Sequence, residues 1–222
     1  DLNTGDFRLI VSLERLRGLR NEDDVPFSFG RINHTDFAPD GKHFVFLNRW
    51  KKEAKVPGGK TRFFVSDLEG KSISDMVDTY RISHFAWNNE REIIAWMEYG
   101  GRKGFWLIDT ETNGVKFVSE KIQVLDGHCS YSKDKRHILL DTYPLEGLER
   151  DRDGFPYPDG YRYLKIFDTS EEKETVLGKY YSPPLISDVI RCDLHPRWGR
   201  KCDKISFDSI HEGYRRTYAV YL

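Results

Sequence analysis

Four of the seven histidines recur at one place in a repeated pattern. Each is followed three residues later by an aromatic residue, and ten residues later by an apolar residue that opens a run of β-forming side chains. The four are His34, His84, His128 and His195. Imidazole can bind a divalent metal through a neutral nitrogen, or it can act as a general base. Histidines at one register of a repeat can therefore build a single site if the fold brings the repeats together.

The segments that position these histidines have the form of β-propeller blades. Turns rich in Gly, Asn and Asp separate short β-forming runs, and about four such runs follow one another in each repeat of 44 to 67 residues. We predict an all-β chain, a β-propeller of four-stranded antiparallel blades, with 1–222 as a single domain or a fragment of one. The blades are expected at about 31–78, 81–120, 125–180 and 190–222, with 1–13 as the outer strand of a preceding or closing blade.

Composition excludes several classes of protein. Lys and Arg number 35 against 36 Asp and Glu, and this balance argues against a nucleic-acid partner. No segment is long and apolar enough to span a membrane, and no secretory signal is visible. Cys129, Cys192 and Cys202 lack the spacing of a disulfide scaffold. The compartment stays open, with a secreted or periplasmic location slightly favoured over a cytoplasmic one.

One face of the predicted propeller collects polar and aromatic side chains. Each histidine begins an innermost strand, so the loops after the second strands return to the same face; these are expected to be long, at 48–61, 98–104, 142–161 and 209–216. Candidate substrate-binding and catalytic residues on this face are Arg49, Trp50, Arg81, Tyr143, Arg191 and Arg197. Arginine binds carboxylates in bidentate fashion, and aromatic rings stack on sugars. An acidic saccharide is the expected partner, and a protein partner is the alternative.

The histidines allow two kinds of chemistry. His128, Cys192 and His195 would suit zinc, whereas coordination by histidine alone would suit Mn, Zn or Ni. Alternatively, one histidine is a general base. A structural role is open for each: a histidine can belong to a packing network, and Cys192 can be a small buried apolar residue. The repeated aromatic residues are assigned to packing between blades, namely Phe37, Trp87, Tyr131 and Trp198.

Several segments resemble the blades of β-propeller polysaccharide lyases, nearest to oligogalacturonate lyases and their ulvan-lyase-like relatives. The resemblance runs from His34 to Leu222 and is carried by the segments 34–42, 126–132, 140–144, 192–198 and 207–213. The HisPro step at 195–196 and the HisGluGly step at 211–213 are its more specific parts. It implies a larger seven-bladed ring, of which about four blades are present here, and a β-elimination on a uronate-containing oligosaccharide.

The same resemblance implies roles for individual residues. His128 and His195 would lie on the side of a divalent metal, Mn or Zn, and His34 or His84 would be the base. Arg191 would pair with the substrate carboxylate, and Tyr143 would protonate the leaving oxygen. Arg197 stands where such a family would place a second ligand after His195, which departs from the pattern. The alternative is a non-catalytic propeller that binds a saccharide or a protein.

Overall fold

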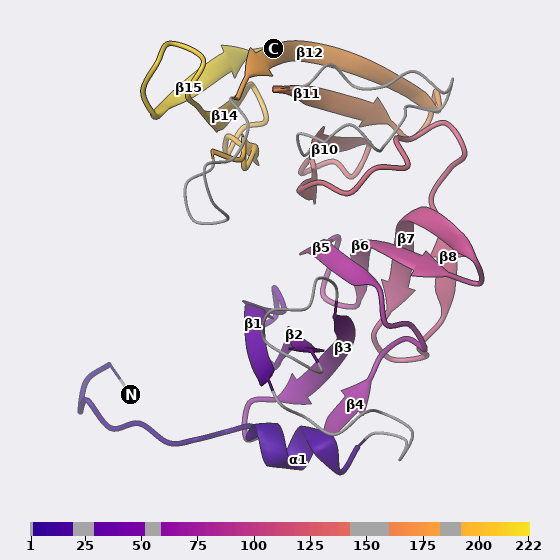
Figure 1. Ribbon diagram of the computed structural model, residues 1–222, viewed down its shortest axis with the longest axis vertical. Helices are drawn as coiled ribbons and strands as arrows, with labels where there is room; N and C mark the ends of the chain where they lie inside the picture. Colours follow the sequence, from indigo (N-terminus) through magenta and orange to yellow (C-terminus); the bar gives the residue numbers. More distant parts are fainter. Residues whose placement is uncertain (1, 20–28, 52–58, 143–159, 183–191) are drawn as a thin grey trace. The chain divides into compact units, whose positions relative to one another are not determined.

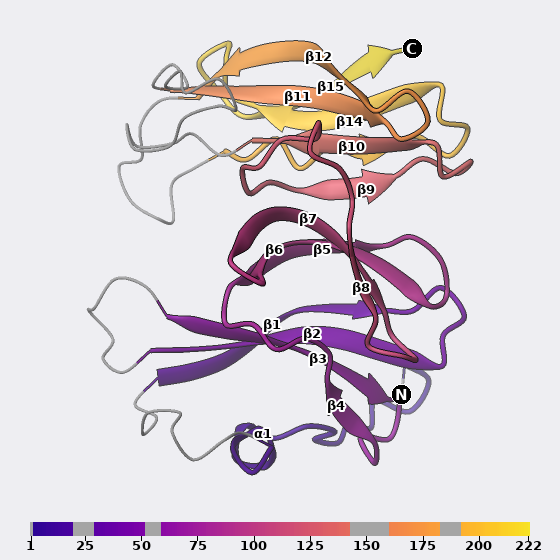
Figure 2. The same ribbon diagram turned by 90° about the vertical axis from the view of Figure 1, so that its right-hand side faces the viewer.

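A computed structural model describes residues 2–19, 29–51, 59–142, 160–182 and 192–222. The chain divides into two compact units, Asp1–Ile82 and Ser83–Leu222, and each is described by itself (Figures 1 and 2). The β-propeller fold predicted from the repeats is confirmed, with one antiparallel sheet for each predicted blade. Within the described ranges, none of the helices has the length and apolar character needed to cross a membrane.

Unit 1 contains blade 1 and one short helix. The helix is α1 (Leu13–Arg17), and the blade has the order β1 (Phe29–Phe37), β2 (His43–Lys51), β3 (Lys60–Asp67) and β4 (Ile73–Asp75). Ser12 caps the helix by accepting a hydrogen bond from the backbone N–H of Arg15. Leu16 then packs on the blade core of Phe44, Phe46 and Phe64. Residues 2–12, for which the sequence predicts an outer strand, form no strand in this structure.

Blade 2 is a four-stranded sheet with a tight central hairpin. Its strands are β5 (Ile82–Trp87), β6 (Glu92–Tyr99), β7 (Arg102–Asp109) and β8 (Val115–Phe117). The segment 98–104, expected to be a long loop, is not one, because β6 and β7 stay paired up to Tyr99 and Arg102. Gly100 and Gly101 both have positive φ, 57° and 79°, which is the backbone of a two-residue turn that matches strand twist.

Blades 3 and 4 complete unit 2. Blade 3 has the order β9 (Cys129–Tyr131), β10 (His137–Asp141), β11 (Tyr161–Asp168) and β12 (Lys173–Tyr181). Blade 4 has three strands in the described residues: β13 (Arg197–Trp198), β14 (Lys204–Ser209) and β15 (Arg216–Tyr221). The sequence predicts the third β-run of each repeat at 61–67, 104–109, 162–168 and 217–222, and these ranges agree with β3, β7, β11 and β15 to within two residues at each end.

Apolar contacts join neighbouring blades within unit 2. One buried cluster includes Ile94 and Phe105 of blade 2 and Leu140 and Phe167 of blade 3, with Tyr131 packed against it. A second cluster joins Leu139 and Leu164 to Ile205 and Phe207 of blade 4, with Trp198 packed against it. The Trp198 indole N–H donates to the Ser130 carbonyl at 3.2 Å. The packing role predicted for Tyr131 and Trp198 is therefore confirmed, whereas Phe37 is 60% exposed and does not have the environment of a packing residue.

Candidate active site

Three of the four repeated histidines lie side by side in unit 2. His84 is in β5, His128 directly precedes β9, and His195 lies two residues before β13. The ring centroids of His84 and His128 are 4.3 Å apart, and those of His128 and His195 are 4.2 Å apart, with interplanar angles of 53° and 51°. We call these three side chains the histidine row. The blade repeat thus brings together residues separated by up to 111 positions in the sequence, as the pattern predicted.

Two members of the row are held by carboxylates. The His84 Nδ1 lies 3.0 Å from Asp126 Oδ1, and the His128 Nδ1 lies 2.9 Å from Asp141 Oδ2. Asp126 is 29% exposed, whereas Asp141 is 1% exposed. A carboxylate at Nδ1 places the proton of a neutral imidazole on that nitrogen, so Nε2 is the atom that would meet a substrate proton or a metal. This arrangement is common to general bases and to metal-bound histidines.

His195 differs from the other two in backbone and electrostatics. Its φ of 43° is in the left-handed region, which is uncommon for a residue other than glycine and costs on the order of 1 kcal/mol. Burial, and next the neighbouring His128, lower the pKa of the His195 imidazole. At neutral pH His195 is therefore neutral, and a neutral ring nitrogen is the form that accepts a proton or binds a metal.

The fourth repeated histidine, His34, lies in unit 1 within β1. Its φ of 51° is also left-handed, and the register of β1 on β2 shifts between Asn33 and Asp36, which marks a bulge at this histidine. His34 and His195 thus share an unusual backbone conformation at the same place in their blades. Such outliers concentrate at functional sites.

The predicted zinc ligands come together only in part. His128 and His195 are in ring contact, whereas the Cys192 thiol donates at 3.9 Å to the Asp193 carbonyl. Burial raises the pKa of this thiol, and a thiolate is the form that binds zinc. Among the described residues, no three His, Cys, Asp or Glu side chains are grouped so as to hold a metal ion. The imidazole nitrogens of the histidine row are nevertheless of the type that binds divalent metal ions, because carboxylates orient two of the rings.

The candidate substrate-binding residues have different environments. Trp50 is 4% exposed and packs edge-on against Tyr80 at 5.9 Å, which is the environment of a packing side chain rather than of an open sugar platform. Arg49 belongs to β2, and Arg81 is exposed in the same unit. Arg197 is exposed at the start of β13 and is close enough to lower the pKa of His195. The other two candidates, Tyr143 and Arg191, lie outside the described residues.

Sequence reasoning did not assign the two carboxylates of the row. Asp126 and Asp141 lie in the segments 126–132 and 140–144, which carry the resemblance to lyases, but the sequence predicts no role for either. One signal could have found Asp141. Thirteen residues after their histidines, blades 1 and 2 carry the apolar Leu47 and Met97, whereas blades 3 and 4 carry Asp141 and Asp208. A carboxylate at a core position of a strand needs charged or hydrogen-bonding partners.

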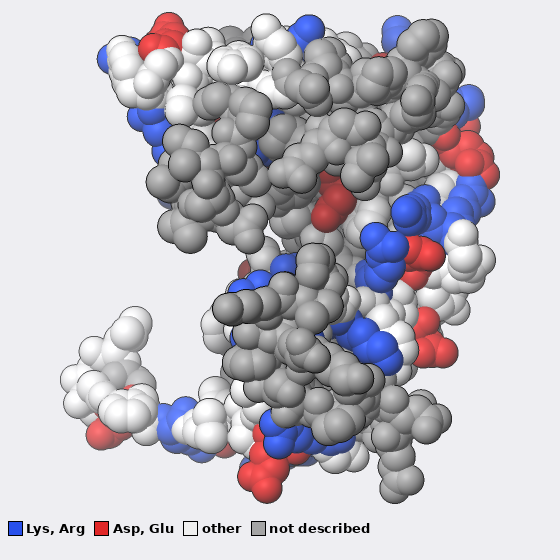
Figure 3. Space-filling view, in the orientation of Figure 1, with Lys and Arg blue, Asp and Glu red and all other residues white. Residues whose placement is uncertain are grey.

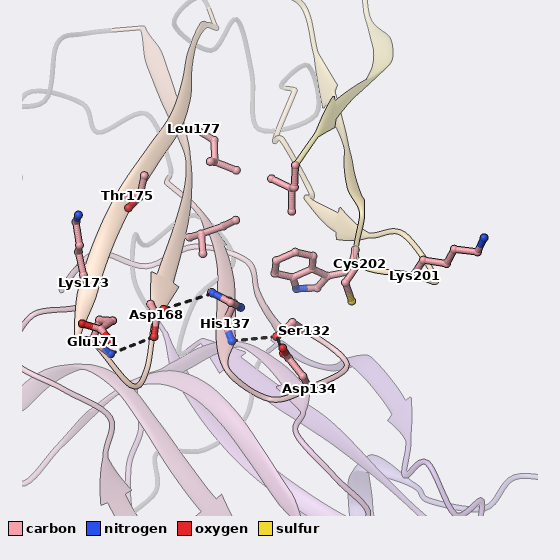
Figure 4. A pocket seen from close by; sticks show the side chains of 13 residues that line it. Ser132, Asp134, His137, Asp168, Glu171, Lys173, Thr175, Leu177, Lys201 and Cys202 are labelled. Atoms are coloured by element: carbon pink, nitrogen blue, oxygen red, sulfur yellow. Dashed lines mark hydrogen bonds and ion pairs between the residues drawn. The ribbon is translucent and has the colours of Figure 1, made fainter.

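A cleft lies at the other end of blade 3. It has a volume of about 720 Å³ and lies between blades 3 and 4, and Figure 4 shows Lys173 of β12 on one side and Cys202 on the other. His137 lines it, with Nε2 3.5 Å from Asp168 Oδ2. His137 begins β10 and Asp141 ends it, so the cleft and the histidine row are at opposite ends of this strand. Figure 3 shows Lys and Arg side chains beside Asp and Glu side chains on the visible face, so this face carries charges of both signs.

Comparison with known proteins identifies the fold but no family. No family model and no curated protein matches the sequence. The chain is structurally similar to an oligogalacturonate lyase from Vibrio parahaemolyticus, with 15% identity, a TM-score of 0.60, and coverage of 86% of this chain and 48% of that one. It is also similar to a puromycin hydrolase, with 9% identity, a TM-score of 0.54, and coverage of 86% and 27%. The chain therefore spans about half the length of the lyase it matches.

A third solved structure is an oligogalacturonate lyase in complex with manganese. It has 12% identity, a TM-score of 0.49, and coverage of 87% of this chain and 65% of that one. Identities this low show a common fold and do not transfer an activity. The chain thus shares the β-propeller fold of the Vibrio parahaemolyticus lyase and the puromycin hydrolase, and its chemistry has to be argued from the histidine row.

Proposed function

We propose that this chain is a polysaccharide-lyase-like propeller that cleaves a uronate-containing oligosaccharide by β-elimination. The observation that carries the proposal is the histidine row, in which three adjacent imidazoles include two that are oriented by carboxylates. Oriented imidazoles can abstract a weakly acidic proton. The resemblance to oligogalacturonate lyases supports a uronate as the substrate.

The reaction needs three functions from the protein. A base takes the proton from C5, the electron pair of that bond forms the C4–C5 double bond, and the C4–O bond breaks with protonation of the leaving oxygen. We assign the base to His84, with His34 as the alternative. Arg191 and Arg197 would balance the uronate carboxylate, which stabilises the charge that develops at C5 in the transition state. Tyr143 would protonate the leaving oxygen.

A divalent ion would fit this assignment without replacing any of these functions. His128 and His195 would hold it, with Cys192 as the sulfur donor in the case of zinc. Mn or Zn would polarise the substrate carboxylate and so acidify C5. The residues of the chain then hold His128 and His195 in place through Asp141 and present His84 to the substrate.

The test incubates the protein with uronate oligosaccharides in the presence of Mn²⁺ or Zn²⁺. Product is detected by the ultraviolet absorbance of its new double bond. The wild type, His84→Ala and His128→Ala are compared with His137→Ala, the matched control at the opposite end of β10. We expect product from the wild type and His137→Ala, none from a neutral oligosaccharide, and a loss of about 10²-fold or more in the two row variants. Absence of product from every uronate with the wild type would contradict the proposal.

The second candidate is a non-catalytic propeller that binds a saccharide or a protein. It is favoured by the hydrogen bonds that Asp141 makes to two members of the row, since such bonds also serve blade packing. It predicts that the wild type binds a uronate oligosaccharide, or a partner protein, without forming the unsaturated product. The same assay, combined with a binding measurement on the same oligosaccharides, separates the two candidates.

A further inference from the structure

The carboxylate of Asp141 occupies a position that packing alone would give to an apolar side chain. It follows the buried residues Ile138, Leu139 and Leu140 on β10 and is itself 1% exposed. The corresponding residues of blades 1 and 2, Leu47 and Met97, are fully buried apolar side chains. Blade 4 carries Asp208 there, whose side chain is more exposed, at 13%. Burying a carboxylate costs several kcal/mol unless hydrogen bonds and charges compensate. The partners of Asp141 should therefore explain why the carboxylate is there.

Those partners are two members of the histidine row. Oδ1 accepts the backbone N–H of His128 at 2.6 Å, and Oδ2 lies 2.9 Å from the His128 Nδ1. Oδ2 also accepts the backbone N–H of His195, at 3.2 Å. One carboxylate thus contacts three nitrogen atoms from two blades. Asp126, by contrast, contacts only His84 in the row and is partly exposed.

Asp141 is itself held firmly in place. Its backbone N–H donates to the His128 carbonyl at 3.2 Å, and its carbonyl accepts the side-chain amide of Gln123 at 2.8 Å. Gly127 lies so close that a Cβ there would be 2.0 Å from the Asp141 carbonyl oxygen and 3.0 Å from Oδ1. The chain before His128 can approach Asp141 only because Gly127 has no side chain. Because the Asp141 carboxylate is held rigidly, the nitrogens of His128 and His195 that donate to it are held in one orientation.

We propose that Asp141 is the positioning residue of the site: it fixes the His128 ring with its proton on Nδ1 and, through the backbone of His195, sets the place of the adjacent ring. The left-handed backbone of His195 (φ 43°) is stabilised by the bond from its N–H to Oδ2. The two rings are then in contact at 4.2 Å. This inference rests on the proposed function for its catalytic meaning, whereas its structural content can be tested without a substrate.

The test is the tautomeric state of each histidine, read from nitrogen-15 chemical shifts of the imidazoles. Asp141→Asn is compared with Asp126→Asn and with Asp208→Asn, which changes the corresponding carboxylate of blade 4; that carboxylate binds Thr217 and Arg215. We expect Asp141→Asn to move His128 away from the Nδ1-protonated form and to shift His195. Asp126→Asn should change only His84, and Asp208→Asn should leave the His128 tautomer as it is.

Asp141→Leu covers the case in which the asparagine variant does not fold. It places in blade 3 the residue that blade 1 carries at this position, so that the core stays filled. A folded variant of either kind with an unchanged His128 tautomer would overturn the proposal, as would the same change in Asp208→Asn. If the chain is also an active lyase, kcat should fall about 10–100-fold with little change in KM. Failure of the lyase proposal would leave the shift measurement interpretable, because that measurement uses the protein alone.

Discussion

Replacement of Gly127 by alanine should disrupt blade 3 and the site together. The added Cβ would lie 2.0 Å from the Asp141 carbonyl oxygen and 2.9 Å from its carbon, and real Cβ atoms do not approach below 3.0 Å. About 1 Å of displacement is therefore required. The neighbouring atom is backbone in a strand that pairs with β11 through Asp141 and Leu164, so it cannot rotate away as a side-chain tip would.

The size of the effect follows from two contributions. Forcing an extra methyl group into a packed region costs typically 1–3 kcal/mol. Moving the chain also lengthens the bond from the His128 N–H to the Asp141 carboxylate, and a hydrogen bond to a charged group is worth about 1.5–3 kcal/mol. Together these predict a loss of about 2.5–6 kcal/mol in the free energy of unfolding of unit 2. The corresponding fall in melting temperature is roughly 5–24 °C.

Urea and thermal unfolding of Gly127→Ala, beside Gly114→Ala, test this reasoning. Gly114 lies in an exposed turn, and a Cβ there would come 3.1 Å from the Thr112 hydroxyl, a side-chain atom that can move. Gly114→Ala should change the free energy of unfolding by no more than about 0.5–1 kcal/mol, in either direction. If Gly127→Ala unfolds within about 1 kcal/mol of the wild type and its His128 tautomer is unchanged, the close approach at Asp141 does not hold the site.

Three further predictions concern burial and charge. Burial raises the pKa of Asp75 to about 6 despite its ion pair with Arg62. Because the folded state then binds a proton that the unfolded state has released, the free energy of unfolding should fall by at most about 3 kcal/mol as pH rises from about 4 to about 6. Urea unfolding of Asp75→Asn should lack this pH dependence. Phe167→Ala should lose about 3–5 kcal/mol of unfolding free energy by leaving a cavity between blades 2 and 3, whereas an unchanged urea midpoint would contradict that packing. A thiol reagent should label Cys202 in the native protein but leave Cys129 unmodified until unfolding, because Cys129 is buried and burial raises the pKa of its thiol.

The repeat made most of the fold predictable. A histidine, an aromatic residue and a β-run at constant spacing mark each blade, and Tyr131 and Trp198 pack between blades as that spacing implies. The tight turn at Gly100 and Gly101 differs from the long loop predicted at 98–104, because the strands on either side extend beyond their apolar residues. Glu98 and Lys103 are paired by the backbone hydrogen bonds between β6 and β7, which the pattern of polar and apolar side chains does not predict.

The histidines of the site could be predicted from the sequence, whereas the carboxylates that hold them could not. Equivalent places in successive blades converge in a propeller, so His84, His128 and His195 could be grouped from their register alone. Asp126 and Asp141 contact them through turns and strand ends whose geometry depends on local close approaches, such as the one at Gly127. No periodic pattern encodes a contact of that kind.

The most direct test of the histidine row as one binding site is a titration of the protein with a galacturonate oligosaccharide, followed through the ring proton resonances of all seven histidines. Binding at the row should shift His84, His128 and His195 together with a single dissociation constant, while His137 at the opposite end of β10 should not shift. Shifts confined to histidines outside the row, or separate dissociation constants for its three members, would contradict it.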